Sequence, residues 1–323
     1  MPAGATRTGI GAGETNVVRY IGRRLWQMIP ILFGVSLGAF MFNQALPGDP
    51  ARLLAGPDAT LEQVQAMRTR LGLDRPWPVR YVYFLRGALV GDFGRSFRTH
   101  EPVGRVIAQY TEPTLTLSLV STALAVVAGM GVGVLQAVRR NSPGDYASTV
   151  ASVLGVSTPS FFLGLLLIYV FAVDLHWFPT GGTMDGWRSV VLPSVTLAAG
   201  AAAAIARFTR SSLLEVLGED FVRTARAKGV RERWVLTRHS LRNALIPVLT
   251  VVGLQFGFVL SGAIIIETVF TFPGLGFLLI QSISFRDYPV VTAEVLLFAL
   301  QFLLINLAVD VLYAVLDPRV SYA

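Results

Sequence analysis

The chain has 323 residues, of which 53% are hydrophobic and only 15% are charged, whereas roughly 25% of the residues are charged in ordinary soluble domains. This composition excludes a large soluble domain and indicates an integral membrane protein. The formal net charge of +7 does not indicate nucleic acid as a partner, because the basic residues gather at the ends of apolar runs, as orienting residues do in proteins surrounded by membrane lipid.

The N-terminal part of the chain predicts a short tail and a first transmembrane helix. Residues 1–24 carry four arginines and one glutamate, which predicts a cytoplasmic tail. Residues 25–46 form an uncharged run of 22 residues, and such a helix crosses a hydrocarbon core of about 30 Å. A secretory signal peptide has a shorter apolar core and a small-residue cleavage site, so we predict that this helix is not cleaved and begins inside.

Residues 47–112 predict a long extracytoplasmic loop that forms a subdomain of its own. The prolines and glycine of Leu46-Pro47-Gly48-Asp49-Pro50 end the first helix. Thr60 and Gln63 predict a capping box at the start of an amphipathic helix, and Gly72 is typical of the position after its end. A second amphipathic segment follows at residues 81–90. The loop has a net charge of +2, but a loop of this length crosses regardless of charge.

Residues 113–316 alternate apolar runs with loops, which predicts a core of five more transmembrane helices. The predicted spans are residues 115–138, 146–173, 193–206, 244–266 and 290–309. Thr158-Pro159-Ser160 predicts a kink in the third span. The alanines of the fourth span favour close helix contact.

The charges of the loops predict six spans with both termini inside the cell. The inner segments before residue 25, at 139–145 and at 207–242 have net charges of +3, +1 and +5, whereas the outer loops at 174–188 and 267–289 are each minus one. The inner tail, residues 317–323, is neutral. This distribution follows the positive-inside rule.

The sixth span carries acidic residues at its two ends. Acids within a membrane often mark functional sites, and Asp310 with Asn306 has the spacing of one helix face. Because Asp310 lies near the inner end of the span and Glu294 near the outer end, we interpret both as interfacial anchors.

The most highly charged segment follows the fourth span. Residues 207–242 contain nine basic and four acidic side chains. The apolar spacing predicts an amphipathic helix over residues 213–228 that continues from the fourth span, with Glu219 and Arg223 as an i, i+4 ion pair. Gly229 is typical of the position past a helix end, and residues 231–241 predict a second short helix. This helix-turn-helix on the inner membrane face requires a partner for its exposed side.

No motif in the chain predicts an enzyme or a bound cofactor. Lys228 is the only lysine and follows Ala227, so a phosphate-binding loop with its Gly-Lys pair is excluded and any ATP hydrolysis must belong to another chain. The G-x-S-x-G sequence at residues 34–38 falls inside an apolar helix and is a chance match. The three histidines, His100, His176 and His239, are predicted to lie in loops, and with no cysteine a thiolate metal site is excluded.

The charged segment resembles the cytoplasmic loop of ABC importer permeases of the dipeptide, oligopeptide and nickel branch. The likeness covers Asp220-Phe221-Val222-Arg223-Thr224-Ala225-Arg226-Ala227-Lys228-Gly229 and continues to Pro247. Further motifs resemble that branch in order and position, namely Leu46-Pro47-Gly48-Asp49-Pro50, Gly91-Asp92-Phe93-Gly94-Arg95-Ser96, Phe178-Pro179-Thr180-Gly181-Gly182, Glu267-Thr268-Val269-Phe270, Pro273-Gly274-Leu275-Gly276 and Leu316-Asp317-Pro318-Arg319. The resemblance therefore extends over nearly the whole chain.

The resemblance implies a type I ABC importer permease fold in which residues 210–243 form the loop that docks on the ATPase. The residues that it places in this contact are Glu219, Asp220, Arg223, Thr224, Ala225, Arg226, Ala227, Lys228, Gly229, Arg231, Arg238 and His239. The broad importer motif begins with an acid and two alanines, where this chain has Arg223-Thr224-Ala225, so the first polar contact with the ATPase stays open.

The resemblance also implies partners and a location. We expect a second homologous permease, two ATPase subunits that bind ATP and Mg²⁺, an extracytoplasmic substrate-binding protein, and a place in the bacterial inner membrane. Short peptides are the expected substrate, and nickel, glutathione or another small solute are alternatives within the family. An ion-coupled secondary transporter is a second alternative, although such proteins carry intramembrane charges that the predicted spans largely lack.

Overall fold

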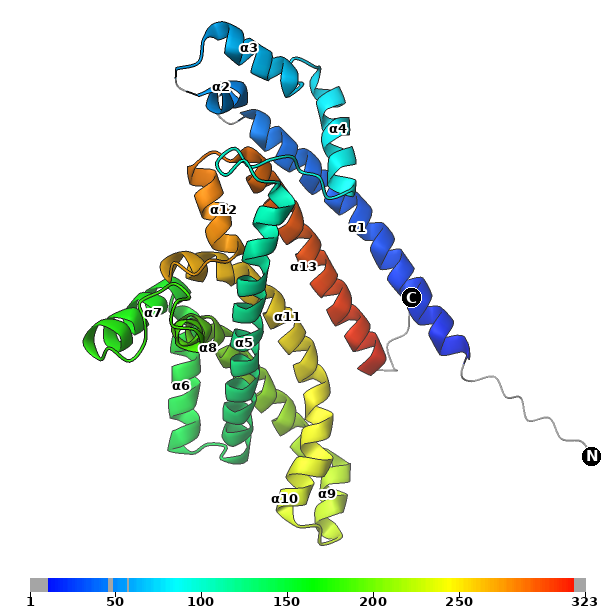
Figure 1. The fold of residues 1–323 in the computed structure, drawn as a ribbon. Coiled ribbons are helices and arrows are strands. Elements are labelled where there is room, and N and C mark those ends of the chain that lie inside the picture. The colour runs from blue at the N-terminus through cyan, green and yellow to red at the C-terminus, as the bar shows by residue number, and fades with distance from the viewer. Residues whose placement is uncertain (1–10, 46–48, 57, 317–323) are drawn as a thin grey trace, which may run out of the picture. The chain divides into compact units, whose positions relative to one another are not determined.

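The computed structural model describes residues 11–45, 49–56 and 58–316, and helices joined by loops make up this part of the chain (Figure 1). In chain order they are α1 (Gly11–Ala45), α2 (Pro50–Ala55), α3 (Leu61–Arg70), α4 (Trp77–Leu89), α5 (Val103–Val138), α6 (Pro143–Ser157), α7 (Ser160–Leu167), the π-helix η1 (Ile168–Asp174), α8 (Trp187–Leu217), α9 (Asp220–Ala227), α10 (Glu232–Trp234), the π-helix η2 (Val235–Ser240), α11 (Leu241–Val269), α12 (Leu275–Ser284) and α13 (Tyr288–Leu316).

The described helices include five that are long and apolar enough to cross a membrane, and α6 with α7 makes a sixth if the two form one broken span. This agrees with the predicted all-α membrane fold. The predicted tail at residues 317–323 and residues 46–48 lie outside the described residues.

Several helices are longer than their predicted spans. α1 begins at Gly11, 14 residues before the predicted start at residue 25, and α5 begins at Val103 rather than at residue 115. Pro193, the predicted start of the fourth span, lies inside α8. Apolar length marks only the part of a helix that lipid surrounds, whereas helical hydrogen bonds are local and continue into water.

The helix predicted for the third span is interrupted rather than kinked. Its two parts, α6 and α7, meet at an angle of 105° at the predicted Thr158-Pro159 position. Thr158 has an extended backbone, with ψ at 125°. The ring of a proline disfavours the helical conformation at the residue before it, so the sequence ends α6 there.

The predicted outer loop at residues 267–289 is wrong in one respect, because it contains the helix α12. Its ten residues are apolar but too short to cross a membrane. A search for membrane-length apolar runs therefore passes over it.

The chain divides into two compact units, whose boundaries fall within α1, α5 and α13 and in the loop between α11 and α12. One unit contains residues 1–26, 115–272 and 304–323, and is called the core unit below. The other contains residues 27–114 and 273–303, and is called the outer unit.

In the outer unit the local sequence signals are confirmed. Thr60 and Gln63 form the predicted capping box of α3. Gly72 follows the helix end with φ at +64°, and the Leu73 amide donates a hydrogen bond back to the Arg68 carbonyl (2.9 Å). This is the reversed hydrogen-bond pattern of a glycine-terminated helix.

The outer unit also shows the environment of the G-x-S-x-G serine. Ser36 lies inside α1, is 3% exposed, and its Oγ is 2.7 Å from the hydroxyl of Tyr81 in α4. Tyr81 packs edge-on against Phe33 and Phe40. The serine therefore belongs to a helix contact, and the strand-turn-helix that a hydrolase requires is absent at residues 34–38.

In the core unit, small residues bring α5 and α8 into close contact. A Cβ atom at Gly129 would lie 2.6 Å from the Ala202 carbonyl oxygen, and one at Gly133 would lie 2.5 Å from that of Ala206. This confirms the close contact predicted from the alanines of the fourth span, since only residues without bulk allow backbones to approach so closely.

Candidate coupling site

The helix that runs into the charged segment ends earlier than predicted. Residues 213–228 were expected to form one helix continuous with the fourth span, but α8 ends at Leu217 and a new helix, α9, begins at Asp220. Glu219 between them has an extended backbone, with ψ at 149°. Glycine at position 218 weakens the helix, and the acid in the first turn of α9 stabilises a new N-terminus.

α9 presents one apolar face to the core unit. Val222 is fully buried and Ala225 is 9% exposed, and both pack with Val235 of η2. Leu217 and Val230 complete this small cluster. The apolar face therefore fixes which side of α9 remains available to a partner.

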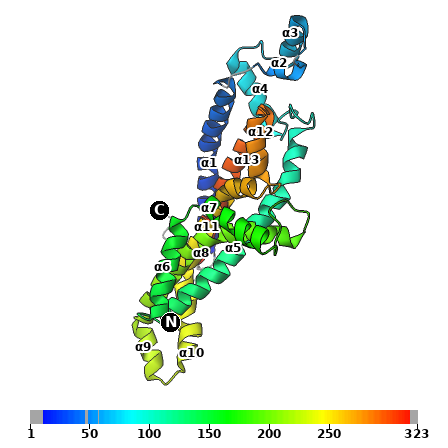
Figure 2. The same cartoon turned by 90° about the vertical axis from the view of Figure 1, so that its left-hand side faces the viewer.

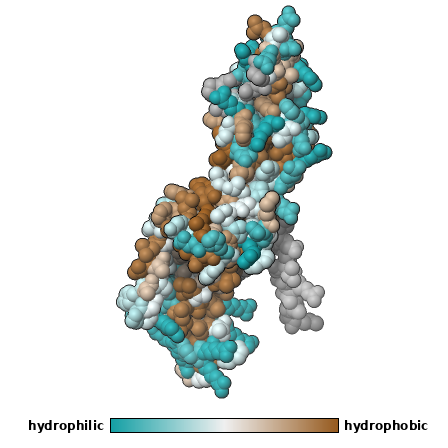
Figure 3. Space-filling model, turned by 60° about the vertical axis from the view of Figure 1, so that its left-hand side comes forward, coloured by the Kyte–Doolittle hydropathy of each residue, from teal (hydrophilic) through white to brown (hydrophobic). Residues whose placement is uncertain are grey.

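The residues predicted for the ATPase contact divide by exposure. Ala225 faces inward, and His239 is half-buried in η2 rather than in a loop. The exposed members are Glu219, Asp220, Arg223, Thr224, Arg226, Ala227, Lys228, Gly229, Arg231 and Arg238. The end of the molecule that contains α9 and α10 carries many hydrophilic residues on its surface, shown in teal in Figure 3.

Gly229 ends α9 as predicted. Its φ is +76°, the Gly229 amide donates to the Arg226 carbonyl (2.9 Å), and the Val230 amide donates to the Ala225 carbonyl (3.2 Å). These two bonds form the glycine-dependent helix terminus in which the chain reverses direction. α9 and α10 consequently lie side by side (Figures 1 and 2).

The turn after Gly229 is closed by an ion pair. Arg226 donates from Nη2 to Glu232 Oε1 (2.7 Å) and from Nε to Oε2 (3.1 Å). This hydrogen bonding raises the pKa of Arg226 above its ordinary value. The predicted pair of Glu219 with Arg223 is wrong, since Arg223 instead contacts Asp220 at 3.5 Å.

The second short helix predicted over residues 231–241 does not end before the fifth span. From Glu232 the helix continues through η2 into α11, and the run Glu232–Val269 qualifies as one candidate span. A π-helical stretch keeps the backbone hydrogen-bonded, so the charged residues before Leu241 do not interrupt the helix.

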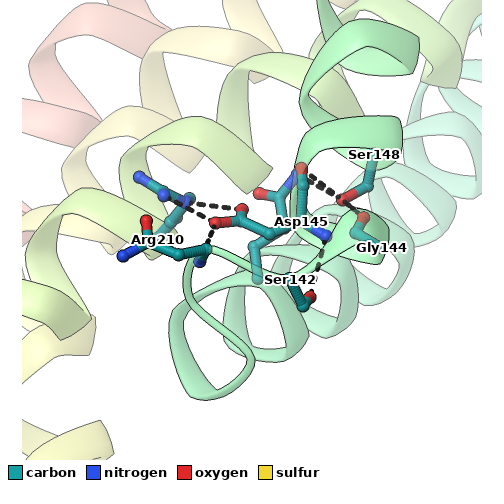
Figure 4. Close-up of polar contacts among 7 residues, drawn as sticks. Ser142, Gly144, Asp145, Ser148 and Arg210 are labelled. Carbon is teal, nitrogen blue, oxygen red and sulfur yellow. Dashed lines mark hydrogen bonds and ion pairs between the residues drawn. The ribbon is translucent and has the colours of Figure 1, made fainter.

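An ion pair that the sequence patterns did not predict joins α6 and α8, about two helical turns before the end of α8 (Figure 4). Arg210 in α8 donates from Nε to Asp145 Oδ1 (3.0 Å) and from Nη2 to Oδ2 (2.9 Å). The Asp145 side chain is 3% exposed and that of Arg210 is 31% exposed. The two residues are 65 positions apart, and the sequence pattern marks each only as a charge at the inner end of a span.

The exposed part of the charged segment carries basic and acidic side chains on α9, α10 and η2. Among the described residues, no three histidine or acidic side chains come together as they would around a metal ion. The exposed basic residues and the backbone of the Gly229 turn form a polar end of the molecule.

Comparisons with known proteins identify the family. Residues 129–322 match the model of the binding-protein-dependent transport system inner membrane component, and residues 17–120 match the model of its N-terminal region. The chain belongs to this family. It is therefore a non-catalytic permease subunit of an ABC importer of the inner membrane, and ATP hydrolysis lies in partner subunits.

Individual relatives agree with this assignment. The permease is 51% identical over 306 residues to the "Glutathione transport system permease protein GsiC" of Escherichia coli strain K12 and of Shigella dysenteriae serotype 1, covering 95% of this chain and 100% of each relative. This branch of the family is the one that the sequence resemblance predicted.

Solved structures show the same fold. The MetNI methionine ABC transporter matches with a TM-score of 0.56 at 23% identity, over 66% of the permease and 96% of the matched chain. An amino acid ABC transporter matches with a TM-score of 0.52 at 17% identity, over 65% and 93%. Family membership implies association with ATPase subunits and a substrate-binding protein, and it sets aside the ion-coupled secondary transporter.

Proposed function

We propose that this permease forms part of the translocation pathway for short peptides, and that glutathione, a tripeptide, is the first substrate to test. The observation that supports this choice is the 51% identity, over the full length of the relatives, to permeases named for glutathione transport. Nickel and other small solutes remain alternatives within the family.

In the proposed mechanism, each subunit of the importer has a separate task. A second homologous permease lines the other side of the pathway, and two ATPase subunits hold ATP and Mg²⁺. Their closure displaces α9 and the Gly229 turn, and rotation of the helices alternates access between the two sides of the membrane. Because the spans are nearly free of charge, substrate is held weakly in transit and the binding protein supplies most of the specificity.

The inward orientation of both chain ends belongs to the same proposal. It places the exposed residues of α9 on the cytoplasmic side, where the ATPase subunits bind, and places residues 49–102 on the outer side, where the substrate-binding protein docks. The charge distribution of the loops supports this orientation.

Uptake by the reconstituted importer tests the substrate. The permease is incorporated into proteoliposomes with its partner permease and ATPases, with ATP inside and the binding protein with radiolabelled glutathione outside. We expect saturable uptake that requires hydrolysable ATP, and competition by unlabelled dipeptide shows whether other short peptides share the pathway. Uptake of nickel with no uptake of glutathione or dipeptide would contradict the proposal.

A further inference from the structure

The Asp145–Arg210 pair joins two helices at the inner ends of their spans. Asp145 lies in the first turn of α6, and Arg210 lies in α8 seven residues before its last residue, Leu217. The carboxylate also accepts a hydrogen bond from the Asn141 amide (3.0 Å), so the turn that precedes α6 is attached to the same group (Figure 4).

The geometry of the pair resists both a change in the distance between α6 and α8 and a rotation of one helix against the other. Two parallel hydrogen bonds between a guanidinium and a carboxylate fix orientation as well as distance. The Asp145 side chain is only 3% exposed, so separation of the helices would break both hydrogen bonds from Arg210 and the contacts that cover the carboxylate. α6 and α8 are therefore held together at this point more firmly than apolar packing alone requires.

The pair lies between the coupling loop and the break in the third span. α8 continues from Arg210 through two turns to Gly218 and α9. α6 continues from Asp145 to the 105° break at Thr158-Pro159. Near the other end of α6, a Cβ atom at Gly155 would be 3.7 Å from that of Ala203 in α8, so the two helices also touch away from the ion pair.

We propose that the Asp145–Arg210 pair makes α6 move with α8, so that displacement of α9 by the ATPases reaches the α6–α7 break. Arg210 and Asp145 are thus positioning residues for transport that touch neither substrate nor ATPase. This inference rests on the proposed role of α9 as the ATPase contact. A pair that only stabilised the fold would have no effect on coupling in an importer that still assembles.

The test replaces both members at once. Asp145→Asn with Arg210→Gln removes the ion pair and leaves no unpaired buried charge. Removal of only one partner would leave such a charge and destabilise the protein more. Asp310→Asn is the control. It removes an ion pair with a similar N–O distance, from Arg24 to Asp310 at 3.0 Å, but with more exposed side chains, at 43% and 32%. The assembled importer is compared with wild type in each case.

The first measurement is a distance between spin labels. Because the chain has no cysteine, Val150→Cys on α6 and Glu215→Cys on α8 give unique labelling sites, and both residues are exposed. With the ion pair intact, we expect the same label distance in the ATP-free importer and in the importer trapped with ATP. In the double variant we expect the distance to differ between the two states. A constant distance in the double variant overturns the inference.

The second measurement is the amount of substrate imported per ATP hydrolysed. Coupling between sites typically corresponds to a 5- to 150-fold effect, so we expect a loss of at least about fivefold in the double variant and none in Asp310→Asn. Unchanged coupling also overturns the inference. The label distance needs no transported substrate, so it tests the pair even if glutathione is not the substrate.

If the double variant does not assemble, Arg210→Lys replaces it. Lysine keeps the charge but cannot form the two parallel hydrogen bonds of the guanidinium. We then expect an intermediate loss of coupling, and wild-type coupling in Arg210→Lys counts against the inference.

Discussion

Gly229 has a backbone conformation that other residues adopt only with strain, with φ at +76°. A Cβ atom at this position would meet nothing within 4 Å, so the requirement for glycine is conformational rather than spatial. The turn that it forms lets Arg226 and Glu232 meet and sets α9 beside η2. A change here therefore acts on the shape of the proposed docking surface without removing any side chain from it.

Gly229→Ala tests this requirement. The left-handed conformation costs a residue with a Cβ roughly 1–2 kcal/mol, so we expect membrane insertion to be unchanged and the affinity for the ATPase subunits to fall by about fivefold or more. Titration of the purified permease pair with ATPase measures this affinity. Gly200→Ala is the control, because its Cβ also meets nothing within 4 Å but its φ is not positive, and equal affinities for the two variants would refute the prediction.

Local signals at single residues were predictable because cause and effect lie within a few positions. The capping box at Thr60 and Gln63 and the terminating glycines Gly72 and Gly229 each depend on hydrogen bonds spanning no more than five residues. The bond from Arg210 to Asp145 crosses 65 residues. Nothing in either local sequence distinguishes a paired arginine from one that only orients a span, so this contact was not predictable.

At the scale of helices, boundaries between helix and loop were the least predictable feature. Hydropathy detects the lipid-facing length of α1, α5 and α13 but not their extensions into water. It passes over α12, whose apolar run is short. At Gly218 the reverse error occurs, since the amphipathic spacing on both sides suggested one helix where the backbone breaks into α8 and α9.

α2 and α3 in the outer unit are linked by an ion pair that responds to pH. Arg68 Nη2 donates to Asp49 Oδ2 at 2.6 Å, and the Asp49 side chain also caps α2 through the Ala51 amide (3.1 Å). The hydrogen bond from Arg68 lowers the pKa of Asp49 below its ordinary value of 3.8. The charged form is therefore favoured in the folded segment.

Acid should loosen this segment selectively. A depressed carboxyl pKa contributes stability that is fully present above the unfolded pKa and is lost as pH falls through the folded pKa. We expect the amide protection of α2 and α3 in hydrogen exchange to fall below about pH 4, by an amount corresponding to about 1 kcal/mol or less, because Arg68 is partly exposed.

Asp49→Asn provides the comparison for the acid effect. This variant should show lower protection of α2 and α3 at neutral pH and little further change in acid. Asp58→Asn removes an exposed acid from the same segment and should follow the wild-type pH profile. A wild-type profile in Asp49→Asn would show that the ion pair does not hold these helices together.

At the scale of the whole molecule, the charges of the loops decide between two paths for α6 and α7. A pair of helices bent by 105° either crosses the membrane as one broken span or enters and leaves on the same side. The crossing path gives six spans and puts residues 207–242, with nine basic residues, inside. The re-entrant path leaves five spans and would place that segment outside, against the positive-inside rule.

Labelling of single cysteines distinguishes these paths in the otherwise cysteine-free chain. Asn141→Cys precedes α6, and Met184→Cys follows η1 at a fully exposed position. If α6 and α7 cross the membrane, a membrane-impermeant maleimide labels Met184→Cys in intact spheroplasts and labels Asn141→Cys only in inverted vesicles. Lys228→Cys should behave as Asn141→Cys does, and Leu61→Cys, which is 83% exposed in α3, should behave as Met184→Cys does. Labelling of both Asn141→Cys and Met184→Cys from the same side would contradict the six-span fold and with it the cytoplasmic position of the Gly229 turn.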